Sequence, residues 1–469
     1  MITTPVPRRA AVPRIDGRGS VTVMTALWLL GILFVSAIAI DGGYWYLMRL
    51  REQKAADAAA IAGAVVLADG NTGSIADTTD GAIRAAGQDV AAANGFDSAA
   101  ATTTVTYPYN GNSNQVAVLI SRTAPTFLST AFGLISQPPT VNAFAVAALA
   151  EDTADPVCIL GLNGPVTIGA LSVELNAKCT VASNSTSATA IEVPQALIGS
   201  FYSLYSAGGI CVVVAGNCAD VGSRYLLEGY PAFAPITDLI KLMLFKTQVA
   251  PAEFQPPVSN PYLPLNTLSL NLAAAPAPQS VSLPLLPLEE TFQPGDYANT
   301  LTANAAVDNF QPGTYVLENG IDIQGALGAN VVVNGTGVTF VVQGGAVNIG
   351  ASSGLNVGVI THLSAPAVNP DNPALSGVLL DIPPSAAVDT LSLGNLNVLS
   401  VMQGAIYAPA TSVALGALSL SLGISGCEVI VAKQVTIPSL ALGVFPTSST
   451  ACAAAGTAMP HPYYVELVQ

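Results

Sequence analysis

The longest apolar stretch of the chain is Val21–Ile40, which contains twenty residues and no charged side chain. As a helix, twenty apolar residues are about long enough to cross the ~30 Å hydrocarbon core of a membrane. Basic residues before a span favour a cytoplasmic location, and four arginines precede this one: Arg8, Arg9, Arg14 and Arg18. We therefore predict a cytoplasmic tail over residues 1–20 and a single transmembrane helix over 21–40, with the rest of the chain outside the cytoplasm.

Two other interpretations of this stretch are a cleavable leader and a soluble core helix. A cleavable leader has a shorter apolar region of ~7–15 residues followed by a small-residue cleavage site. Here the apolar stretch runs instead into Asp41-Gly42-Gly43 and the aromatic residues Tyr44, Trp45 and Tyr46. A soluble core helix of this length normally has a polar face. The pattern therefore favours a retained anchor, and processing of the N-terminus stays open.

The Ala-rich segment after the span predicts a second helical part. Leu47–Ala68 is dominated by Ala, the strongest helix former, and its charged residues fall early. The anchor is thus expected to continue as a stalk helix over 41–68, followed by a stop at Asp69-Gly70-Asn71. Another Ala-rich helix is expected over 83–94, with Gly95 as its C-terminal stop.

Alternating apolar and polar residues then predict strands. The runs 101–109 and 115–123 alternate, and the Asn110-Gly111-Asn112 sequence between them is typical of a hairpin turn. A short amphipathic helix is expected over 125–135, and a closing strand over 140–149. Residues 69–150 are therefore interpreted as a small α+β module tied to the stalk.

The pattern changes after residue 150. Short Val, Ile and Leu runs recur between Gly and Asn residues, and strands this short bury a face only when stacked as rungs. We predict solenoid parts over 151–200 and 291–450. The interruption at 201–290 is expected to hold one helix (236–249) and a Pro-rich extended connector, and residues 451–469 a tail. The predicted fold is mainly β, with a transmembrane and stalk α-helix, the α+β module and a parallel β-helix; a β-sandwich is the alternative.

Charge narrows the classes of ligand. The chain has 29 acidic and 14 basic residues, and only Lys433 carries a positive charge after Lys246. A surface that binds nucleic acid needs Lys and Arg to neutralise phosphate. No nucleic-acid partner is therefore expected for the second half of the chain.

The cysteines indicate disulfides. Their number is even and all lie on the expected exported side, as suits an oxidising compartment. Sequence neighbours form the simplest pairing, although six cysteines allow fifteen arrangements. A zinc site would need Cys-x-x-Cys or nearby His, and His362 and His461 stand in no ligand pattern, so no cofactor is expected. The disulfide candidates are Cys158, Cys179, Cys211, Cys218, Cys427 and Cys452.

Catalysis of the kind found in β-helix enzymes is not expected. A polysaccharide lyase needs a cationic base or stabiliser, and Lys433 is isolated. A hydrolase needs two carboxylates across a cleft, whereas Glu289 and Glu290 are adjacent in the Pro-rich connector. The other carboxylates are scattered and are expected to cap turns or keep the surface soluble: Asp308, Glu318, Asp322, Asp371, Asp381 and Asp389.

The N-terminal motifs resemble those of a known family. Arg18-Gly19 precedes the span, Asp41-Gly42 closes it, and Tyr46 and Arg49 follow on the next turn. Together with the run Gln53-Lys54-Ala55-Ala56-Asp57, these residues resemble the N-terminal signature of TadG-like proteins of the Flp pilus (tight adherence) assembly system. The segment APTFLSTAFGLI and the later TVNAFAVAAL also resemble that family.

The chain departs from this pattern in two ways. It lacks a proline common in the middle of the apolar segment, and Met24 stands where type IV pilins carry Glu after the processing Gly. The Met24 departure favours an anchored accessory protein over a polymerising pilin. Some relatives also carry an adhesion domain with an Asp-x-Ser-x-Ser metal motif; this motif is absent here, so no such metal site is expected.

The resemblance implies an accessory or structural protein of the bacterial inner membrane, single-pass, with a cytoplasmic N-terminus and a periplasmic bulk. Inner-membrane lipid and pilus-assembly proteins or pilins would be its partners, bound without catalysis. The candidate residues of the membrane or partner helix are Asp41, Tyr46, Arg49 and Asp57, although Asp41 also fits a membrane-boundary residue and Asp57 also fits a solvated helix face. Small residues along the stalk would permit close approach of another helix. An envelope-attached adhesin that binds a surface glycan is the alternative.

Overall fold

The computed structural model divides the chain into two compact units. Unit 1 holds residues 1–63, 84–147 and 467–469, and unit 2 holds residues 64–83 and 148–466. The residues described are 18–70, 80–99, 101–131, 133–152, 156–169, 174–177, 179–194, 199–214, 217–220, 225–227, 245–247, 249–283, 286–323, 331–350, 359–388, 390–394, 400–415, 426–437, 442–445 and 447–468.

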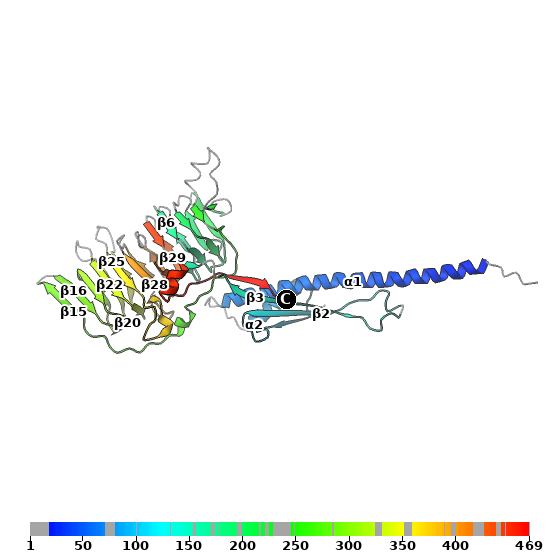
Figure 1. Cartoon of the computed structure of the whole chain (residues 1–469), viewed down its shortest axis with the longest axis horizontal. Coiled ribbons are helices and arrows are strands. Elements are labelled where there is room, and N and C mark those ends of the chain that lie inside the picture. The colour runs from blue at the N-terminus through cyan, green and yellow to red at the C-terminus, as the bar shows by residue number, and fades with distance from the viewer. Residues whose placement is uncertain are drawn as a thin grey trace, which may run out of the picture. The chain divides into compact units, whose positions relative to one another are not determined.

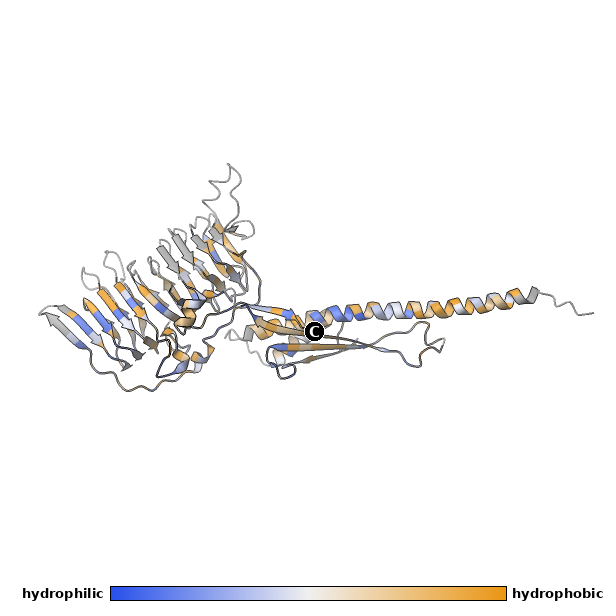
Figure 2. Cartoon of the chain, in the orientation of Figure 1, coloured by the Kyte–Doolittle hydropathy of each residue, from blue (hydrophilic) through white to orange (hydrophobic). Residues whose placement is uncertain are grey.

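One continuous helix, α1 (Arg18–Gly70), contains both the predicted span and the predicted stalk (Figure 1). Its side chains are exposed from Val21 to Val35, and buried positions begin at Ala37. Figure 2 shows the first half of α1 as strongly apolar and the second half as mixed. Within the described residues, α1 is the one helix long and apolar enough to cross a membrane. The predicted helix is therefore confirmed.

The antiparallel part of unit 1 follows the sequence pattern. Helix α2 (Asp80–Ala93) precedes β1 (Thr102–Thr106), β2 (Gln115–Thr123) and β3 (Thr140–Glu151). The strands lie in a sheet of order β1-β2-β3-β31, where β31 is Tyr463–Leu467. Asn110 and Gly111 both have positive φ angles, of 51° and 78°, as the predicted hairpin turn requires.

The helix expected over 125–135 is not formed. The described residues of this segment are bends and turns, and Gly133 has a φ of +66°. Gly133 N–H donates to Thr130 O and Leu134 N–H donates to Ser129 O, so neither bond has helical i→i−4 spacing. The amides of residues 127–129 donate instead to a side chain of α1, described below. We refer to the described residues 125–131 as the 125–131 loop.

Unit 2 is built from short strands. In its first part these are β4 (Val157–Gly161), β5 (Val166–Ile168), β6 (Glu174–Ala177), β7 (Thr180–Ser183), β8 (Ile191–Pro194), β9 (Gly199–Phe201), β10 (Leu204–Ser206), β11 (Ile210–Val214), β12 (Asn217–Asp220), β13 (Tyr225–Leu227) and β14 (Phe245–Thr247).

The connector holds the 3-10 helix η1 (Leu263–Thr267), and a second one, η2 (Pro373–Leu375), comes later. The strands of the second part are β15 (Gln279–Leu283), β16 (Leu286–Phe292), β17 (Gly295–Tyr297), β18 (Leu301–Ala303), β19 (Val307–Phe310), β20 (Gly313–Leu317), β21 (Gly320–Ile323), β22 (Val331–Thr336), β23 (Val338–Val342), β24 (Ala346–Ile349), β25 (Val359–Ser364), β26 (Val378–Asp381), β27 (Thr390–Leu393), β28 (Val401–Leu415), β29 (Glu428–Ile437) and β30 (Leu442–Phe445).

Strands three apart in sequence pair in parallel, as successive coils of a parallel β-helix do. The ladders β16–β19–β22–β25, β17–β20–β23–β26 and β18–β21–β24–β27 all follow this rule (Figure 1). Equivalent residues stack in register, as in Tyr315, Phe340 and Leu380, all of them buried in the core. Within the described part of this sheet, only β11–β12 and β15–β16 pair antiparallel, so the pairing favours the β-helix over the alternative β-sandwich.

The order of coils in the stack differs from the order in the chain. β29 near the C-terminus pairs in parallel with β4, and Ile430 lies opposite Ile159. The strands β4–β11 and β16–β29 are thus two blocks joined end to end at β29–β4. The connector between the blocks packs on the outer face of the sheet, where Val258, Tyr262 and Leu265 are buried in one apolar cluster.

Two expectations about segments of unit 2 differ from the structure. Phe245–Thr247, within the helix expected over 236–249, is strand β14, and residues 228–244 lie outside the described residues. Residues 451–469, expected as a tail, hold most of helix α4 (Ser449–Ala454) and strand β31.

Candidate functional site

Asp41 joins α1 to the 125–131 loop within unit 1. Its carboxylate accepts backbone hydrogen bonds from Phe127 N–H (3.0 Å), Leu128 N–H (3.1 Å) and Ser129 N–H (2.7 Å). The Ser129 hydroxyl donates to the same carboxylate. Asp41 is 0 % exposed, so these bonds replace water around a residue that directly follows the apolar span.

The hydrogen bonds decide the ionisation of Asp41. Burial by itself would raise the pKa of this carboxyl, but the Ser129 hydroxyl and the three backbone N–H groups outweigh it and lower the pKa to about 2. Asp41 is therefore ionised at neutral pH. We call this buried carboxylate and its four donors the clamp, which fixes the 125–131 loop to α1.

Aromatic residues surround the clamp. Trp45 donates its indole N–H to Pro125 O at 3.1 Å, and Met48 packs in a small apolar cluster with Trp45 beside it. The rings of Tyr44 and Phe127 meet edge to face, with centroids 5.2 Å apart. The 125–131 loop is thus held to α1 by side chains from two successive turns of the helix.

Asp57 and Gln53 form a second contact between α1 and the sheet. Gln53 Nε2–H donates to Asp57 Oδ1 at 2.7 Å and to Phe144 O on β3 at 2.9 Å. The neighbouring Glu52 is 0 % exposed, and neither carboxylate oxygen has a hydrogen-bond partner. Burial raises the pKa of Glu52 to about 7, although the positive charge of Arg122 acts to lower it. Sequence reasoning missed Glu52, because a Glu in a helix ordinarily faces water.

Tyr46 and Arg49 point away from these contacts. The Tyr46 side chain is 64 % exposed, and Arg49 is also exposed. Of the four candidates on this helix, Asp41 and Asp57 therefore act inside unit 1. Tyr46 and Arg49 leave their side chains free to meet another molecule.

The small residues of the stalk pack largely within the chain itself. Ala55, Ala56 and Ala59 are at most 1 % exposed. A Cβ added to Gly87 of α2 would lie 3.3 Å from the Ala59 carbonyl oxygen, so the two helices approach closely there. This close approach, which the sequence suggested for an external helix, is used by α2.

Several carboxylates of unit 2 are buried, contrary to the expectation that they cap turns or face water. Glu290 lies opposite Asp308 in the β16–β19 ladder, so Glu290 is in a strand rather than in a Pro-rich connector. Asp308 is 0 % exposed without a hydrogen-bond partner on either oxygen. Burial, and then the charge of Glu290, raise the pKa of Asp308 to about 7.

Asp381 and Glu428 are similar. Burial raises the pKa of Asp381 to about 7 and that of Glu428 to about 8. The backbone of Glu428 is tied to Thr447, whose Oγ1 accepts from Glu428 N–H (3.1 Å) and donates to Glu428 O (2.8 Å). Asp381 lies between the inner-core residues Leu380 and Ile382, so its side chain faces the outer side of the sheet, where it lies opposite Tyr407 of the outer apolar cluster. Asp389, the last of the scattered carboxylates, lies outside the described residues.

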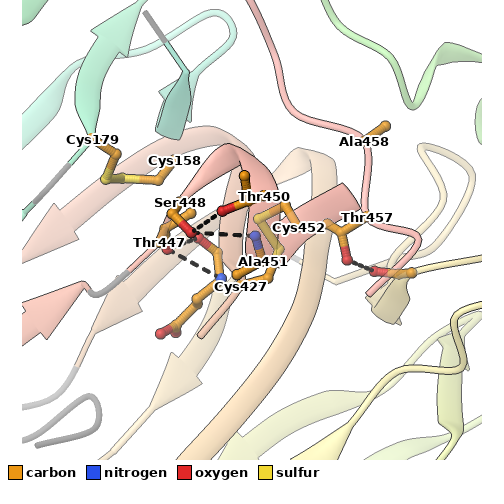
Figure 3. Close-up of a disulfide and its surroundings, with 12 residues drawn as sticks. Cys158, Cys179, Cys427, Thr447, Ser448, Thr450, Ala451, Cys452, Thr457 and Ala458 are labelled. Atoms are coloured by element: carbon orange, nitrogen blue, oxygen red, sulfur yellow. Dashed lines mark hydrogen bonds between the residues drawn. A yellow bond between two sulfur atoms is a disulfide. The ribbon is translucent and has the colours of Figure 1, made fainter. Parts of the chain in front are cut away.

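The cysteines form three disulfides between sequence neighbours: Cys158–Cys179, Cys211–Cys218 and Cys427–Cys452. Figure 3 shows Cys427–Cys452 at the short helix α4, where the Ser448 hydroxyl accepts from Ala451 N–H. This disulfide ties α4 to the strand that begins at Glu428. His461, expected in a tail, donates its backbone N–H to Ser259 Oγ of the connector at 2.9 Å.

The comparisons with known proteins single out the same N-terminal segment. Residues 19–66 match a family model described as Putative Flp pilus-assembly TadE/G-like. No curated protein and no solved structure matches the chain. The matched segment contains Asp41, Tyr46, Arg49 and Asp57, and it confirms the resemblance found in the sequence. In its apolar helix and stalk, the chain is similar to TadE/G-like proteins of Flp pilus assembly.

Proposed function

We propose that the protein is a membrane-anchored accessory or structural component of Flp-type pilus biogenesis or tight adherence, acting by binding and not by catalysis. The observation that carries this proposal is the match over residues 19–66, which covers the apolar span and Asp41. Asp41 is part of the matched segment and fixes the 125–131 loop to α1. The segment therefore anchors the chain and also organises unit 1.

The proposed arrangement is an inner-membrane protein with residues 1–20 in the cytoplasm, residues 21–40 in the membrane and the remainder of the chain in the periplasm. The arginines before the span support this orientation. The three disulfides support an oxidising compartment. Membrane lipid would hold the span, and pilus-assembly proteins or pilins would bind the exposed part of the stalk.

Tyr46 and Arg49 are the proposed partner contacts, because both are exposed on the stalk just beyond the span. Arg51 is a matched control: it is also exposed and basic, but two residues along a helix turn it to another face. We expect Tyr46→Ala/Arg49→Ala to weaken co-purification of pilus-assembly proteins with the full-length chain, whereas Arg51→Ala has little effect.

The wider role is tested by deleting the gene and complementing it. Deletion should abolish surface attachment and pilus filaments, and the full-length chain should restore both. Unchanged filaments and attachment in the deletion strain would contradict the proposed role.

The parallel stack of unit 2 supports a second candidate, an envelope-attached adhesin that binds a surface glycan. Binding of the full-length protein to defined glycans on an array, together with normal pili in the deletion strain, would favour this candidate. A polysaccharide-active enzyme is the third and weakest. The opposed carboxylates Glu290 and Asp308 provide its test. If the protein turned over a uronate or neutral glycan and Asp308→Asn abolished this activity, the non-enzyme proposal would be overturned.

A further inference from the structure

The clamp fixes how far the 125–131 loop lies from the apolar span. Phe127 N–H and Leu128 N–H both donate to Asp41, the first residue after Val21–Ile40. One turn further along α1, Trp45 donates to Pro125 O. When the span crosses a bilayer, the loop backbone must therefore lie at the edge of the hydrocarbon core, at the level of Asp41.

The side chains at this level suit a lipid surface. Phe127 is 56 % exposed although its ring contacts Tyr44, and Tyr46 and Leu47 are 64 % and 56 % exposed. Aromatic residues gather where a membrane protein meets the headgroups. The loop residues 125–131 carry no charge, and the hydroxyls of Thr126 and Thr130 hydrogen-bond to each other at 2.6 Å.

We infer that the 125–131 loop is a second membrane contact, which places Phe127 among the lipids at the outer edge of the span. We assign lipid rather than a partner protein to this contact because Asp41 holds the loop directly beside the end of the span, whose surface faces lipid. The inference rests on membrane insertion of Val21–Ile40, and it is independent of any role in pilus assembly.

The test compares two exposed phenylalanines that α1 holds at different depths. Phe144 is 42 % exposed, and its carbonyl accepts from Gln53, which lies twelve residues beyond Asp41 or about 18 Å along the helix. Full-length protein would be reconstituted into phosphatidylcholine vesicles whose acyl chains are brominated near the headgroup. Phe127→Trp and Phe144→Trp would each be made in a Trp28→Phe background. The Trp28→Phe protein without a reporter gives the fluorescence of Trp45, which is subtracted.

We expect bromine to quench the fluorescence of the Phe127→Trp reporter and to leave that of Phe144→Trp unchanged. The native chain supplies the insertion control, because Trp28 lies inside the span and should be quenched. Quenched Trp28 with an unquenched Phe127→Trp reporter would overturn the inference and leave the anchor intact. Quenching of both phenylalanine sites alike would also overturn it, since depth would then not follow the clamp. Unquenched Trp28 would overturn insertion and the inference together.

A second measurement shows whether the Phe127→Trp substitution has displaced the loop. Amide exchange at residues 127–129 should stay as slow in Phe127→Trp as in the parent, because Asp41 binds the backbone and not the ring.

Discussion

Ser129 and Asp41 are 88 residues apart in sequence, yet Ser129 N–H donates to the Asp41 carboxylate at 2.7 Å and the Ser129 hydroxyl donates to the same oxygen. Charge-assisted bonds of this kind are stronger than bonds between neutral groups. The pair joins the end of the apolar helix segment to the loop that follows the β1–β2 hairpin. Together with Trp45, which donates to Pro125 O, Asp41 therefore fixes the 125–131 loop along α1.

Removing the clamp should release the loop. In Asp41→Ala, the amides of residues 127–129 lose their acceptor, and we expect their hydrogen exchange to become at least about fivefold faster. Asp57→Ala is the control, because Asp57 accepts only from Gln53 Nε2 among the bonds described for this region. Equal protection in Asp41→Ala and the native protein would contradict the clamp.

The same clamp should resist acid. A lowered pKa means that its stabilisation is fully present above the ordinary carboxyl value of 3.8 and is lost as the pH falls through about 2. Exchange protection at residues 127–129, corrected for the intrinsic rate, should thus persist at pH 4. Loss of protection between pH 5 and pH 3, the ordinary titration range of a solvated carboxyl, would count against a lowered pKa for a hydrogen-bonded Asp41.

Enlarging Ala59 should destabilise unit 1. The site is 0 % exposed and lies against Gly87 of α2, so Ala59→Leu should lower the free energy of unfolding by about 1–3 kcal/mol through overpacking. Ala58→Leu adds the same side chain at a half-buried position on the same helix and should cost clearly less. Urea unfolding of the two variants in one detergent provides the measurement. Equal losses would show that α2 does not require a small residue at position 59.

Neutralising Asp308 should stabilise unit 2 above neutral pH. Its pKa is raised to about 7 from 3.8, so the folded state holds a proton that the unfolded state releases. Stability linked to this group is therefore complete below about pH 4 and is lost as the pH rises to about 7. We expect Asp308→Asn to raise the unfolding free energy at pH 8 by about 1–3 kcal/mol and to change it little at pH 4.

Thermal unfolding at both pH values, followed by β-sheet circular dichroism, would check the Asp308 prediction. Asp371→Asn removes an exposed carboxylate of the same unit and controls for net charge. The prediction is wrong when Asp308→Asn shifts stability equally at pH 4 and pH 8.

The disulfides should stabilise according to the length of chain that they close. Cys427–Cys452 spans 25 residues and Cys211–Cys218 spans 7. The loop-entropy model gives about 3.5 kcal/mol for the longer loop and about 2.5 kcal/mol for the shorter one. The double variant Cys427→Ser/Cys452→Ser should therefore lose more stability in urea than Cys211→Ser/Cys218→Ser. A larger loss of stability in Cys211→Ser/Cys218→Ser would mean that packing around α4 compensates for the missing Cys427–Cys452 disulfide.

Where a short sequence window contains its own explanation, the predicted element agrees with the structure. The span and stalk follow from an apolar run and an Ala-rich run without Pro, and together they form α1. The hairpin follows from two alternating runs around Asn110-Gly111, whose positive φ angles suit these residues. Residues 125–135 do not form the predicted helix, because their amphipathic pattern does not reveal that the N–H groups of residues 127–129 donate to Asp41.

The buried acids were missed for a related reason. Asp308 sits two residues before the core residue Phe310, so strand alternation places both on the inner face. That signal was available in the sequence. It was overridden by the general rule that carboxylates face water.

The sequence by itself determined the elements whose causes are local: the length of the apolar helix segment, the Ala-rich stalk, the hairpin turn and the short strands that require stacking. Only the tertiary structure decided which distant segments meet. Ser129 reaches Asp41, and Ile430 lies opposite Ile159, so the last coil joins the first block of strands. The physical reason is that stacked strands of similar composition pair almost equally well in many orders, and loop closure and burial over the whole chain select one.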